Sequence, residues 1–405
     1  MTELRKVTGA KLYFQTLDDK SECVGVYTNG ELFFDSLPTG ISRTWRHSGA
    51  LRDNNIEYAW LYTGGKNLQQ VCPDKYSKQL LASQAKFRAY LKSFKIAKIN
   101  LRELCFFDLV PHDFLLEFCE VKNKITQHVF ETFDRPENYA YLSDVHRLLH
   151  KIKFNDLFLD TKNSRNLLTN TNDRNRIKKL LSGPKHIDYN LFGTTTGRLT
   201  TYTNSFPMLT LKRELRQIVK PKNDWFVSLD YNGAEIRTVL ALSDEPQPEH
   251  DIHLWNCENV FGGSIGRSEA KEKFFAWLYN PESKEIENDF YNRDSLLEQY
   301  YSNGCISTPF GRVIEVEKRK AFNYLIQSTT SDIVLKQAVK LDQFLHGKKS
   351  FISHIVHDEI VIDLDDSERN IVPLMRNIFE NNIFGSFVSN VNAGKNYYDL
   401  KELNL

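Results

Sequence analysis

Acidic side chains stand at two places where the sequence predicts that a strand ends. The apolar run FVSL ends in Asp230, and the alternating run IVHDEIVID carries Asp358 and Glu359 at the expected tip of a hairpin. Two carboxylates converging from separate strands could hold a pair of Mg²⁺ ions, which take few protein oxygens and keep other positions for water and phosphate oxygens. Taken alone, a capping role for Asp230 and an exposed turn at Asp358 are the plainer interpretations.

A second group of candidate residues recurs every four positions in GRSEAKEKFFAWLYN. Arg267, Lys271, Phe275 and Tyr279 would form one row on a helix, roughly 18 Å long. Cations at one end could grip phosphate oxygens, and aromatic rings at the other could stack on a sugar or base, which together suit a nucleoside triphosphate. The alternative is an amphipathic helix with an apolar core stripe and a solvated basic end. The sequence contains no G-x-x-x-x-G-K-[ST] motif, which excludes a triphosphate site of the P-loop kind.

A basic stretch surrounds the segment GTTTGRLTT, which contains Arg198. From Lys151 to Lys222 there are 15 Lys and Arg residues against 5 Asp and Glu residues. Such a stretch, together with small hydroxyl side chains, could follow a phosphate backbone without reading base sequence. A solvated basic face and an ordinary loop are the alternatives.

The elements that must position these residues alternate between strands and helices, but not in βαβ order. We expect a small α/β region over the first 100 residues with a helix at 78–94, helices within 112–152, a strand around 225–231, helices within 251–301, a hairpin at 303–316 and a long helix at 318–344. This order indicates a mixed, α+β fold.

Bulk composition is that of a multidomain protein without membrane segments. The chain has 405 residues, of which 41% are hydrophobic and 26% charged, and its formal net charge is +1. Two or three domains are expected from this length. The sequence has no run of about 18 apolar residues and no apolar leader, so we expect no membrane span and a cytoplasmic location. The six cysteines never form C-x-x-C, which argues against a zinc knuckle and favours reduced thiols.

Six segments resemble, in order, the motifs of the polymerase I-like (family A) DNA polymerases. They are TGRLTT, DYNGAEIR, DIHLWNCENVFG, RSEAKEKFFAWLY, NYLIQSTTSDI and VHDEI, and they cover about half of the chain, from Gly193 to the C-terminus. The resemblance implies a right-hand fold of palm, fingers and thumb beside an N-terminal α/β domain. The expected boundaries are 1–110 for that domain, 111–190 for the thumb, 191–250 for the first part of the palm, 251–317 for reduced fingers and 318–405 for the second part of the palm.

The resemblance also implies roles for individual residues. Catalytic roles fall to Asp230, Asp358, Lys271 and Glu359, with metal bound by Asp230, Asp358 and the backbone of Tyr231. The dNTP would be bound by Arg267, His253, Phe275, Tyr279, Glu235 and Tyr231. Contacts with the primer-template would come from Arg198, Arg216, Asn323, Gln327 and His357. Phe275 would pack on the incoming sugar, and Glu235 would lie beneath it and exclude a ribose 2′-hydroxyl.

The activity implied is template-directed DNA synthesis, in which a primer 3′-hydroxyl attacks a dNTP with the help of two Mg²⁺ ions, for which Mn²⁺ can substitute. DNA primer-template and dNTPs are the expected partners, and a processivity factor is neither implied nor excluded. A reverse transcriptase, a single-subunit RNA polymerase-like enzyme and a catalytically inactive DNA-binding relative remain as alternatives. The compactness of the chain would suit a phage enzyme acting in its host's cytoplasm.

Some positions depart from the family pattern. Ala276 and Asn280 stand where the family usually has glycine, and short spacings between motifs predict trimmed fingers. Residues 1–150 contain no D-x-E triplet of the kind that family exonucleases carry, and Gln15 and Leu17 stand where those acids would fall. We therefore expect a degenerate exonuclease-like domain that cannot bind metal or proofread, with an unrelated α/β domain as the alternative.

Overall fold

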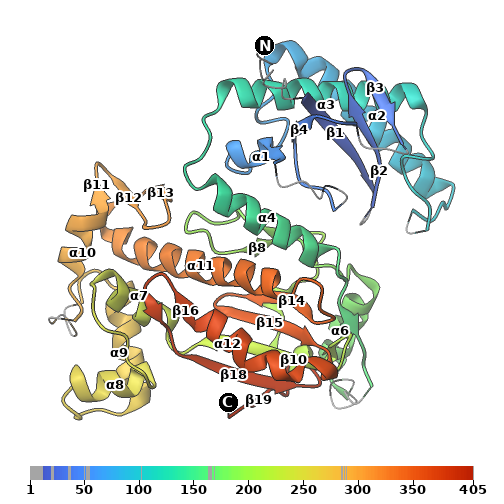
Figure 1. The fold of residues 1–405 in the computed structure, drawn as a ribbon. Coiled ribbons are helices and arrows are strands. Elements are labelled where there is room, and N and C mark those ends of the chain that lie inside the picture. The colour runs from blue at the N-terminus through green and yellow to red at the C-terminus, as the bar shows by residue number, and fades with distance from the viewer. Residues whose placement is uncertain are drawn as a thin grey trace, which may run out of the picture. The chain divides into compact units, whose positions relative to one another are not determined.

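The computed structural model describes residues 12–19, 22–34, 38–49, 51, 55–101, 103–162, 167, 169–283, 286, 288 and 290–404. The chain forms two compact units, residues 1–154 and residues 155–405 (Figure 1). Each unit has its own sheet and its own covering helices, so each is described by itself. The division lies within the segment expected to form the thumb, and the boundaries predicted from the sequence remain predictions.

Unit 1 is built on a five-stranded mixed sheet in the order β3-β2-β1-β4-β5. Its strands are β1 (Leu12–Asp19), β2 (Glu22–Thr28), β3 (Glu31–Phe33), β4 (Ile41–Thr44) and β5 (Glu57–Tyr58). β1, β2 and β3 form an antiparallel meander, whereas β4 runs parallel to β1 and β5 parallel to β4. Between β2 and β3, Asn29 and Gly30 have φ values of 51° and 87°, as a two-residue hairpin turn with positive φ at both positions requires.

Helices cover the sheet of unit 1. They are α1 (Ala59–Tyr62), α2 (Asp74–Ile96), α3 (His112–Thr132) and α4 (Tyr139–Lys153). α3 packs against β1 and against α2, and its buried face joins Leu17 of β1 to Phe114 and Cys119 in one apolar cluster. The predicted helices at 78–94 and within 112–152 are confirmed, since their apolar spacing of three and four matches these buried faces.

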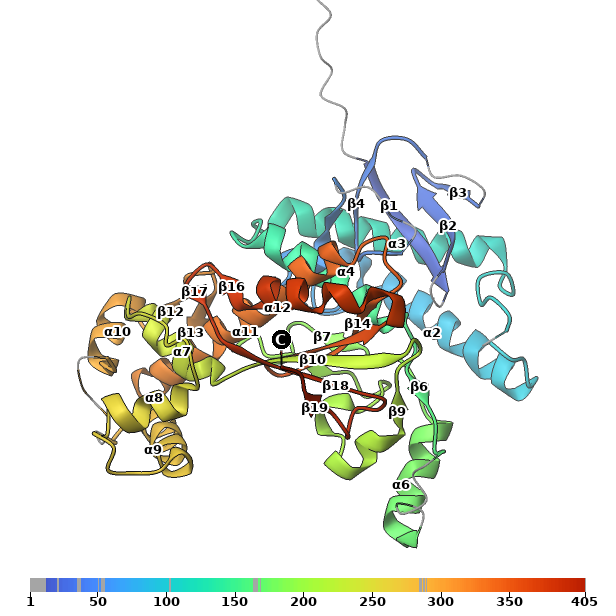
Figure 2. The same cartoon turned by 60° about the horizontal axis from the view of Figure 1, so that its bottom comes forward.

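Unit 2 is built on an antiparallel sheet in the order β14-β15-β10-β18-β19 (Figure 2). Its strands are β10 (Trp225–Tyr231), β14 (Phe351–Val356), β15 (Glu359–Leu364), β18 (Ser389–Gly394) and β19 (Lys401–Glu402). β10 lies at the centre, because its residues from Phe226 to Asp230 pair with both neighbours. The helices α11 (Lys318–Phe344) and α12 (Val372–Glu380) pack against this sheet and against each other.

A helical layer with its own apolar cluster adjoins the sheet of unit 2. It contains α7 (Ala234–Leu242), α8 (Ile252–Asn259), α9 (Arg267–Tyr279) and α10 (Arg293–Tyr300), followed by the meander β11 (Tyr301–Ser302), β12 (Cys305–Ser307) and β13 (Val313–Glu315). Phe274, Trp277 and Tyr291 are fully buried at the centre of this cluster. The helix predicted at 318–344 is confirmed as α11.

Shorter elements complete unit 2. They are β6 (Phe158–Leu159) paired with β9 (Val219–Lys220), β7 (Tyr189–Asn190) paired with β8 (Thr200–Thr201), β16 (Asn381–Asn382) paired with β17 (Gly385–Ser386), the helix α6 (Thr171–Ser182), and the 3-10 turns Met208–Thr210, Arg213–Ile218 and Asp366–Ile371. None of the helices in the described part of the chain is long and apolar enough to cross a membrane. The predicted α+β class is confirmed.

Candidate active site

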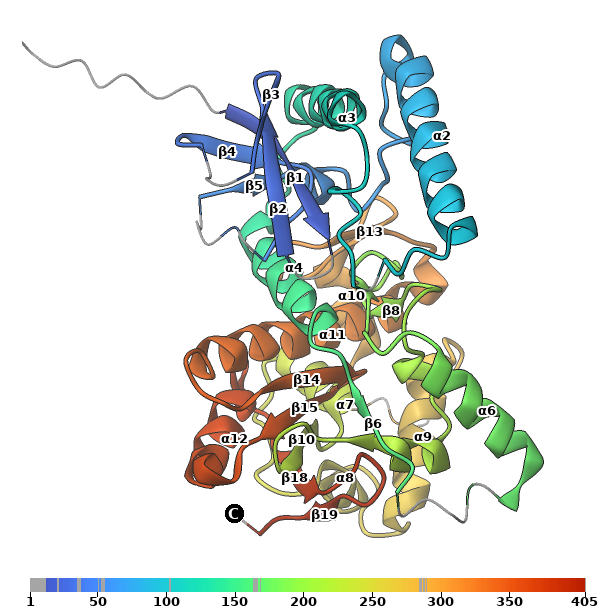
Figure 3. The same cartoon turned by 90° about the vertical axis from the view of Figure 1, so that its right-hand side faces the viewer.

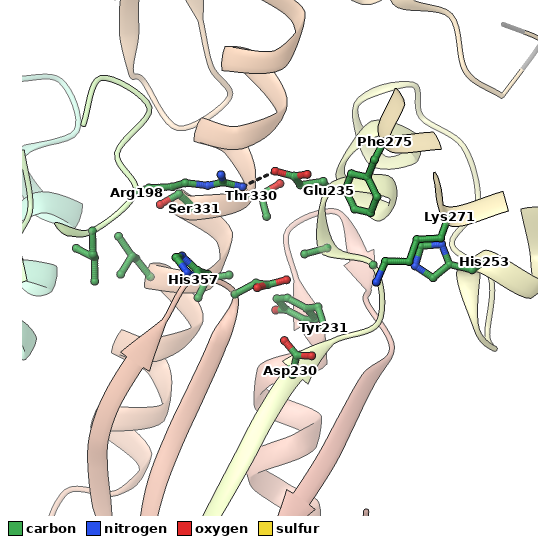
Figure 4. Close-up of a pocket in the computed structure, with 16 residues that line it drawn as sticks. Arg198, Asp230, Tyr231, Glu235, His253, Lys271, Phe275, Thr330, Ser331 and His357 are labelled. Carbon is green, nitrogen blue, oxygen red and sulfur yellow. Dashed lines mark hydrogen bonds and ion pairs between the residues drawn. The ribbon is translucent and has the colours of Figure 1, made fainter. Parts of the chain in front are cut away.

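A cavity of about 430 Å³ in unit 2 collects most of the residues singled out from the sequence (Figure 4). Its walls come from the end of β10, the start of α7, α8, α9, α11, the β14–β15 hairpin tip and the loop before β8. Nine predicted site residues line it: Arg198, Asp230, Tyr231, Glu235, His253, Lys271, Phe275, His357 and Asp358. In Figure 4, Arg198 and His357 enter from one side, and Lys271 and His253 from the other.

The register of the central sheet brings the two predicted metal-binding carboxylates to one place. Asp230 pairs directly with Glu359 across β10 and β15, and Val356 pairs with Glu359 across the hairpin, which leaves His357 and Asp358 as its two-residue tip. Asp358 therefore reaches the cavity that Asp230 lines, although the two are far apart in the sequence. His357 has a φ of 57°, a left-handed conformation that is uncommon for any residue but glycine.

The electrostatic surroundings of Asp230 favour its neutral form. Burial, together with the nearby Asp358 and Glu359, raises the pKa of this carboxyl to about 7, while Lys271 acts in the opposite direction. A buried acid that lacks enough positive charge nearby is one that a divalent cation would keep ionised.

Asp230 and Asp358 are carboxylates that could together hold a divalent cation. No group of three or more His, Cys, Asp or Glu side chains suited to a metal lies within the described part of the chain. Mg²⁺ is commonly bound through one or two carboxylates, with water and substrate phosphates supplying the other ligands. Asp230 and Asp358, facing one cavity, fit that requirement.

Glu359 lies on the same face of the sheet as Asp230 but is held away from the cavity. Its Oε1 accepts a 2.5 Å hydrogen bond from Ser228 Oγ, and its Oε2 accepts a 2.7 Å bond from the Tyr397 hydroxyl. The guanidinium of Arg216 stacks on the Tyr397 ring at 4.7 Å. Tyr397 thus connects Glu359 and Arg216 near the site, although neither of the two lines the cavity. Sequence reasoning missed Tyr397.

Helix α9 has one face toward the cavity and another in the core. Lys271 and Phe275 line the cavity, whereas Phe274, Trp277 and Leu278 are buried on the adjoining side of the helix. The ring of Phe275 stacks on that of Tyr279, with centroids 6.1 Å apart and planes 16° apart. All four residues of the predicted row lie on the helix, although the residues at its two ends, Arg267 and Tyr279, contact other side chains instead of lining the cavity.

The N-terminal end of the row, Arg267, is engaged by Asp251. Arg267 Nε donates to both Asp251 oxygens at 3.2 Å, and its Nη2 donates to Oδ2 at 2.6 Å. Asp251 also caps α8 by accepting from the amides of His253 and Leu254, and its Oδ2 accepts from Asn232 Nδ2 at 2.8 Å. These hydrogen bonds from Arg267 and Asn232 hold the pKa of the Asp251 carboxyl far below its usual range. Arg267 does not line the cavity in this arrangement.

His253 lies in the first turn of α8 and lines the cavity opposite Arg198. It is 4% exposed, and burial, aided by Arg267 and Lys271, lowers its pKa to about 4 although Asp251 acts in the opposite direction. The imidazole is therefore neutral at pH 7. Its Nδ1 has no hydrogen-bond partner among the described residues.

Glu235 lies in the first turn of α7 and is held by residues from two other segments. Arg198 forms an ion pair with its Oε1, and the Tyr279 hydroxyl donates to Oε2 at 3.0 Å. Burial nevertheless raises the pKa of Glu235, because desolvation outweighs Arg198 and Tyr279. Glu235, the residue predicted to exclude a 2′-hydroxyl, is thus fixed in position. Tyr279 does not line the cavity itself and contacts the site through Glu235.

The turn between β10 and α7 requires glycine. Gly233 has a φ of 72°, and a Cβ at this position would lie 2.4 Å from Ile252 Cγ2. The preceding Asn232 accepts a 2.8 Å bond from the Ile252 amide. Asn232 and Gly233 therefore connect the strand that ends in Asp230 to the start of α8.

Tyr189 of β7 links the β7–β8 pair to the hairpin that carries Asp358. Its hydroxyl donates to the Ile355 carbonyl at 2.5 Å and accepts from the Ile355 amide at 2.9 Å. β14 is the edge strand of the sheet, so this hydroxyl satisfies backbone groups that no further strand pairs with. Sequence reasoning did not single out Tyr189.

Two predicted contacts on α11 lie away from the cavity. Neither Asn323 nor Gln327 lines it, and Asn323 instead lines a neighbouring cavity together with Tyr279. The α11 residues that do line it are Thr330, Ser331, Val334 and Leu335, which the sequence analysis missed. These residues lie one to two turns beyond Gln327 on a correctly predicted helix. This spacing could have indicated them from the sequence, since residues three and four apart share a helix face.

In unit 1, the positions expected to have lost exonuclease acids are buried. Gln15 and Leu17 are both 0% exposed, on the same face of β1. Gln15 Nε2 donates to Asn123 Oδ1 and to Thr126 Oγ1 of α3, each at 3.0 Å. The side chains at these positions are therefore taken up by contacts between the sheet and α3.

Comparison with known proteins gives relatives of one kind. The chain is 25% identical to DNA polymerase I of Deinococcus radiodurans over 276 residues, which are 54% of this chain and 29% of that protein. It is 25% identical to the DNA polymerase of Mycobacterium phage D29 over 226 residues, which are 43% of this chain and 37% of that protein. The chain spans about a third of the length of these curated relatives. No family model matches the sequence.

A solved structure shares the fold over nearly the whole chain. The POL domain of Pol1 from M. smegmatis, in complex with DNA primer-template and dNTP, superposes with a TM-score of 0.69 over 97% of each chain at 13% identity. This likeness shows the fold of a polymerase domain, and the relatives supply the sequence similarity. The resemblance expected from the six motifs is thereby confirmed, since the chain is similar in sequence and in fold to DNA polymerases of the polymerase I type.

Proposed function

We propose that this chain is a template-directed DNA polymerase that extends a primer 3′-hydroxyl with dNTPs and lacks proofreading. The observation that carries the proposal is the convergence of Asp230, Asp358 and Lys271 on one cavity with Glu235 at its wall. The relatives named DNA polymerase, and the structural neighbour with its primer-template and dNTP, support the same conclusion.

Each cavity residue has a distinct part in the proposed reaction. Asp230 and Asp358, with the backbone of Tyr231, would hold two Mg²⁺ ions, which when bound lower the barrier by stabilising charge on the attacking and leaving oxygens. Lys271 and neutral His253 face the space for the triphosphate, where Lys271 can neutralise the leaving pyrophosphate. Arg267 would join them after leaving Asp251.

The sugar and the primer terminus are assigned to the remaining parts of the cavity wall. Phe275 would pack on the incoming sugar, and Glu235 beneath it would leave no room for a 2′-hydroxyl. Arg198 and His357 would lie beside the primer end, where contacts in the minor groove check pairing without reading sequence. Tyr279 holds Glu235 through its hydroxyl and would adjoin the templating base. Arg216, Asn323 and Gln327 would contact the DNA beyond the cavity, and Glu359 would support the metal site.

The regions take the domain roles implied by the motifs. Residues 191–250 and 318–405 would be the palm, 251–317 reduced fingers, and 111–190 the thumb. Residues 1–110 would be a degenerate exonuclease-like domain. The contacts of Gln15 support this last assignment, because its amide bonds to α3 at a place where metal-binding acids would be needed.

Primer extension tests the proposal. The intact chain is given dNTPs or NTPs on DNA and RNA templates with Mg²⁺ or Mn²⁺, with Asp358→Asn as the matched variant because it preserves size and removes charge. Extension with dNTPs on DNA that Asp358→Asn abolishes is expected. Extension with NTPs would favour an RNA polymerase, a preference for RNA templates would favour a reverse transcriptase, and absence of extension under all conditions would leave only a DNA-binding relative.

A mismatched primer end tests the absence of proofreading. We expect no Mg²⁺-dependent 3′→5′ removal of the mismatched nucleotide by the intact chain. Removal that persists in an Asp230→Asn variant would show a working nuclease in unit 1 and contradict the degenerate-domain proposal.

A further inference from the structure

Helix α2 of unit 1 carries a dense row of cations that takes no part in the site described above. Among its 23 residues are six Lys and Arg residues against a single acid, Asp74. All six are exposed: Lys75, Lys78, Lys86, Arg88, Lys92 and Lys95. None of them was singled out from the sequence, where the basic stretch noted was a different one.

The cations lie on one side of α2 because its other side is committed to α3. Phe87, Tyr90 and Phe94 pack into the apolar cluster around Phe106 and Phe114. At 100° per residue these three aromatics span about 60° of the helix circumference, and Arg88, Lys92 and Lys95 fall on the opposite half. Figure 3 shows α2 running beside α3 at the edge of unit 1.

Little of this positive charge is neutralised within the protein. Lys86 pairs with Glu117 of α3 at 2.5 Å. Arg88, Lys92 and Lys95 pair with no carboxylate in the described part of the chain. Arg88 and Lys92 are four residues apart and Lys92 and Lys95 are three apart, which are the spacings at which like charges on a helix destabilise it. A polyanion bound along this side would remove that repulsion.

We propose that the exposed side of α2, centred on Arg88, Lys92 and Lys95, binds the phosphate backbone of DNA. The three cations span about 10 Å of the helix axis, along which one strand of a duplex presents roughly three phosphates. The contacts are with backbone phosphates, so binding is independent of base sequence. The inference rests on the proposed function for the identity of the polyanion, and adds a DNA contact on unit 1 outside the active-site cavity.

A membrane surface fits α2 less well than DNA does. Basic helices that lie on a bilayer insert a face of large apolar side chains beneath their cations. The aromatic face of α2 is already packed against α3, and the exposed large apolar residues beside the cations are Leu81, Leu91 and Ile96, which do not form a continuous stripe. Charge without an available insertion face favours a hydrophilic polyanion.

The test is a charge reversal of the full chain, Arg88→Glu with Lys92→Glu and Lys95→Glu. The dissociation constant for a fluorescently labelled primer-template is measured by anisotropy over a series of NaCl concentrations. Loss of three phosphate contacts should weaken binding about tenfold or more and lower the slope of log Kd against log salt by about 2–3. The charge-preserving set Arg88→Lys, Lys92→Arg and Lys95→Arg should bind as the unaltered chain does.

A matched control separates this surface from net charge. Lys340, Lys348 and Lys401 are exposed lysines of unit 2 outside the proposed site, and their triple reversal to Glu changes the net charge equally. We expect a change in Kd of no more than about twofold. If the two triple variants weaken DNA binding equally, or neither does, the inference is overturned. It is also overturned if reversal on α2 leaves DNA binding intact and abolishes binding to phosphatidylserine vesicles.

Two further measurements keep the outcome clear. Circular dichroism and a thermal melt establish that the α2 variant is folded, and if it is not, the neutral set with Gln at 88, 92 and 95 takes its place, with the same expected direction. The single-turnover extension rate at saturating DNA should be unchanged in the α2 variant. If the unaltered chain binds DNA but extends nothing, the proposed function fails while the anisotropy comparison still decides this inference.

Discussion

The ion pair between Arg267 and Asp251 predicts that Asp251 keeps Arg267 from binding the triphosphate until the substrate arrives. Asp251 occupies both Nε and Nη2 of Arg267, the edge of the guanidinium that would grip phosphate oxygens bidentately. Replacing Asp251 by Asn removes the charge while retaining an oxygen that can cap α8. The variant should therefore bind dNTPs more tightly, because Arg267 no longer has to leave a carboxylate. This prediction rests on the proposed role of Arg267.

The size of the effect follows from the exposure of the pair. The Arg267 side chain is 47% exposed and that of Asp251 22%, so solvent screens much of their attraction. Exposed ion pairs contribute up to about 1 kcal/mol, and the two-pronged geometry places this pair near the upper end. Releasing about 1 kcal/mol corresponds to a roughly fivefold decrease in the dissociation constant of the dNTP.

The assay is a double-mutant cycle in single-turnover primer extension. The dNTP dissociation constant is taken from the concentration dependence of the rate in the unaltered chain, Asp251→Asn, Arg267→Ala and the double variant. Asp251→Asn should tighten binding only where Arg267 is present. The cycle is needed because the substitution also removes the acceptor for Asn232 and a negative charge near the site.

Two results would refute the reasoning. Equal tightening in the Arg267→Ala background would mean that Asp251 acts through its charge alone. Weaker dNTP binding in the single Asp251→Asn variant would mean that Asp251 orients Arg267 for the substrate instead of withholding it.

Three further predictions concern stability. Tyr189→Phe leaves the amide and carbonyl of Ile355 without their partner, so it should lower the free energy of unfolding by about 1–3 kcal/mol, measured by urea titration. The substitution should also slow primer extension by loosening the hairpin, and an unchanged extension rate would contradict this. Burial lowers the pKa of His47 to about 3 and holds the pKa of His146 well below its usual value, so on acidification the unfolded chain takes up protons first. Stability should therefore fall as the pH drops below about 6.5, by about 2 kcal/mol from His47 between pH 6.5 and 5. Urea titrations at these two pH values should differ less in His47→Asn, and equal stability of the unaltered chain at both pH values would contradict the prediction. Phe274→Ala should cost about 3–5 kcal/mol, since the ring is 0% exposed, and a loss below 1 kcal/mol in thermal unfolding would show that the cluster collapses around the gap.

Local pattern and motif order were enough to predict the elements and the centre of the site. α3 and α4 were predicted from the spacing of apolar residues, which a buried helix face imposes directly on the sequence. The convergence of Asp230 and Asp358 could not follow from spacing, because it depends on the pairing of β10 with β15. The resemblance supplied it.

Contacts between segments were beyond the sequence. The partners of Glu359, Glu235 and Arg267 come from remote parts of the chain, and nothing in a single sequence marks which hydroxyl or carboxylate will face which charge. Asp251 is a partial exception, since an acid directly before a helix is a capping signal. That signal indicates the cap and not the ion pair with Arg267.

The way the hairpin places Asp358 separates two kinds of mutation. Its position relative to Asp230 is set by the hydrogen-bond ladder from Asp230–Glu359 to Trp225–Leu364, and not by any particular side chain along those strands. Apolar substitutions within β15 should therefore leave the distance between the two carboxylates almost unaltered. Deletion or insertion of a single residue in β15 would turn Glu359 to the other face of the sheet and displace Asp358 from the cavity. We expect chains descended from this one to vary in β15 by substitution while keeping its length constant.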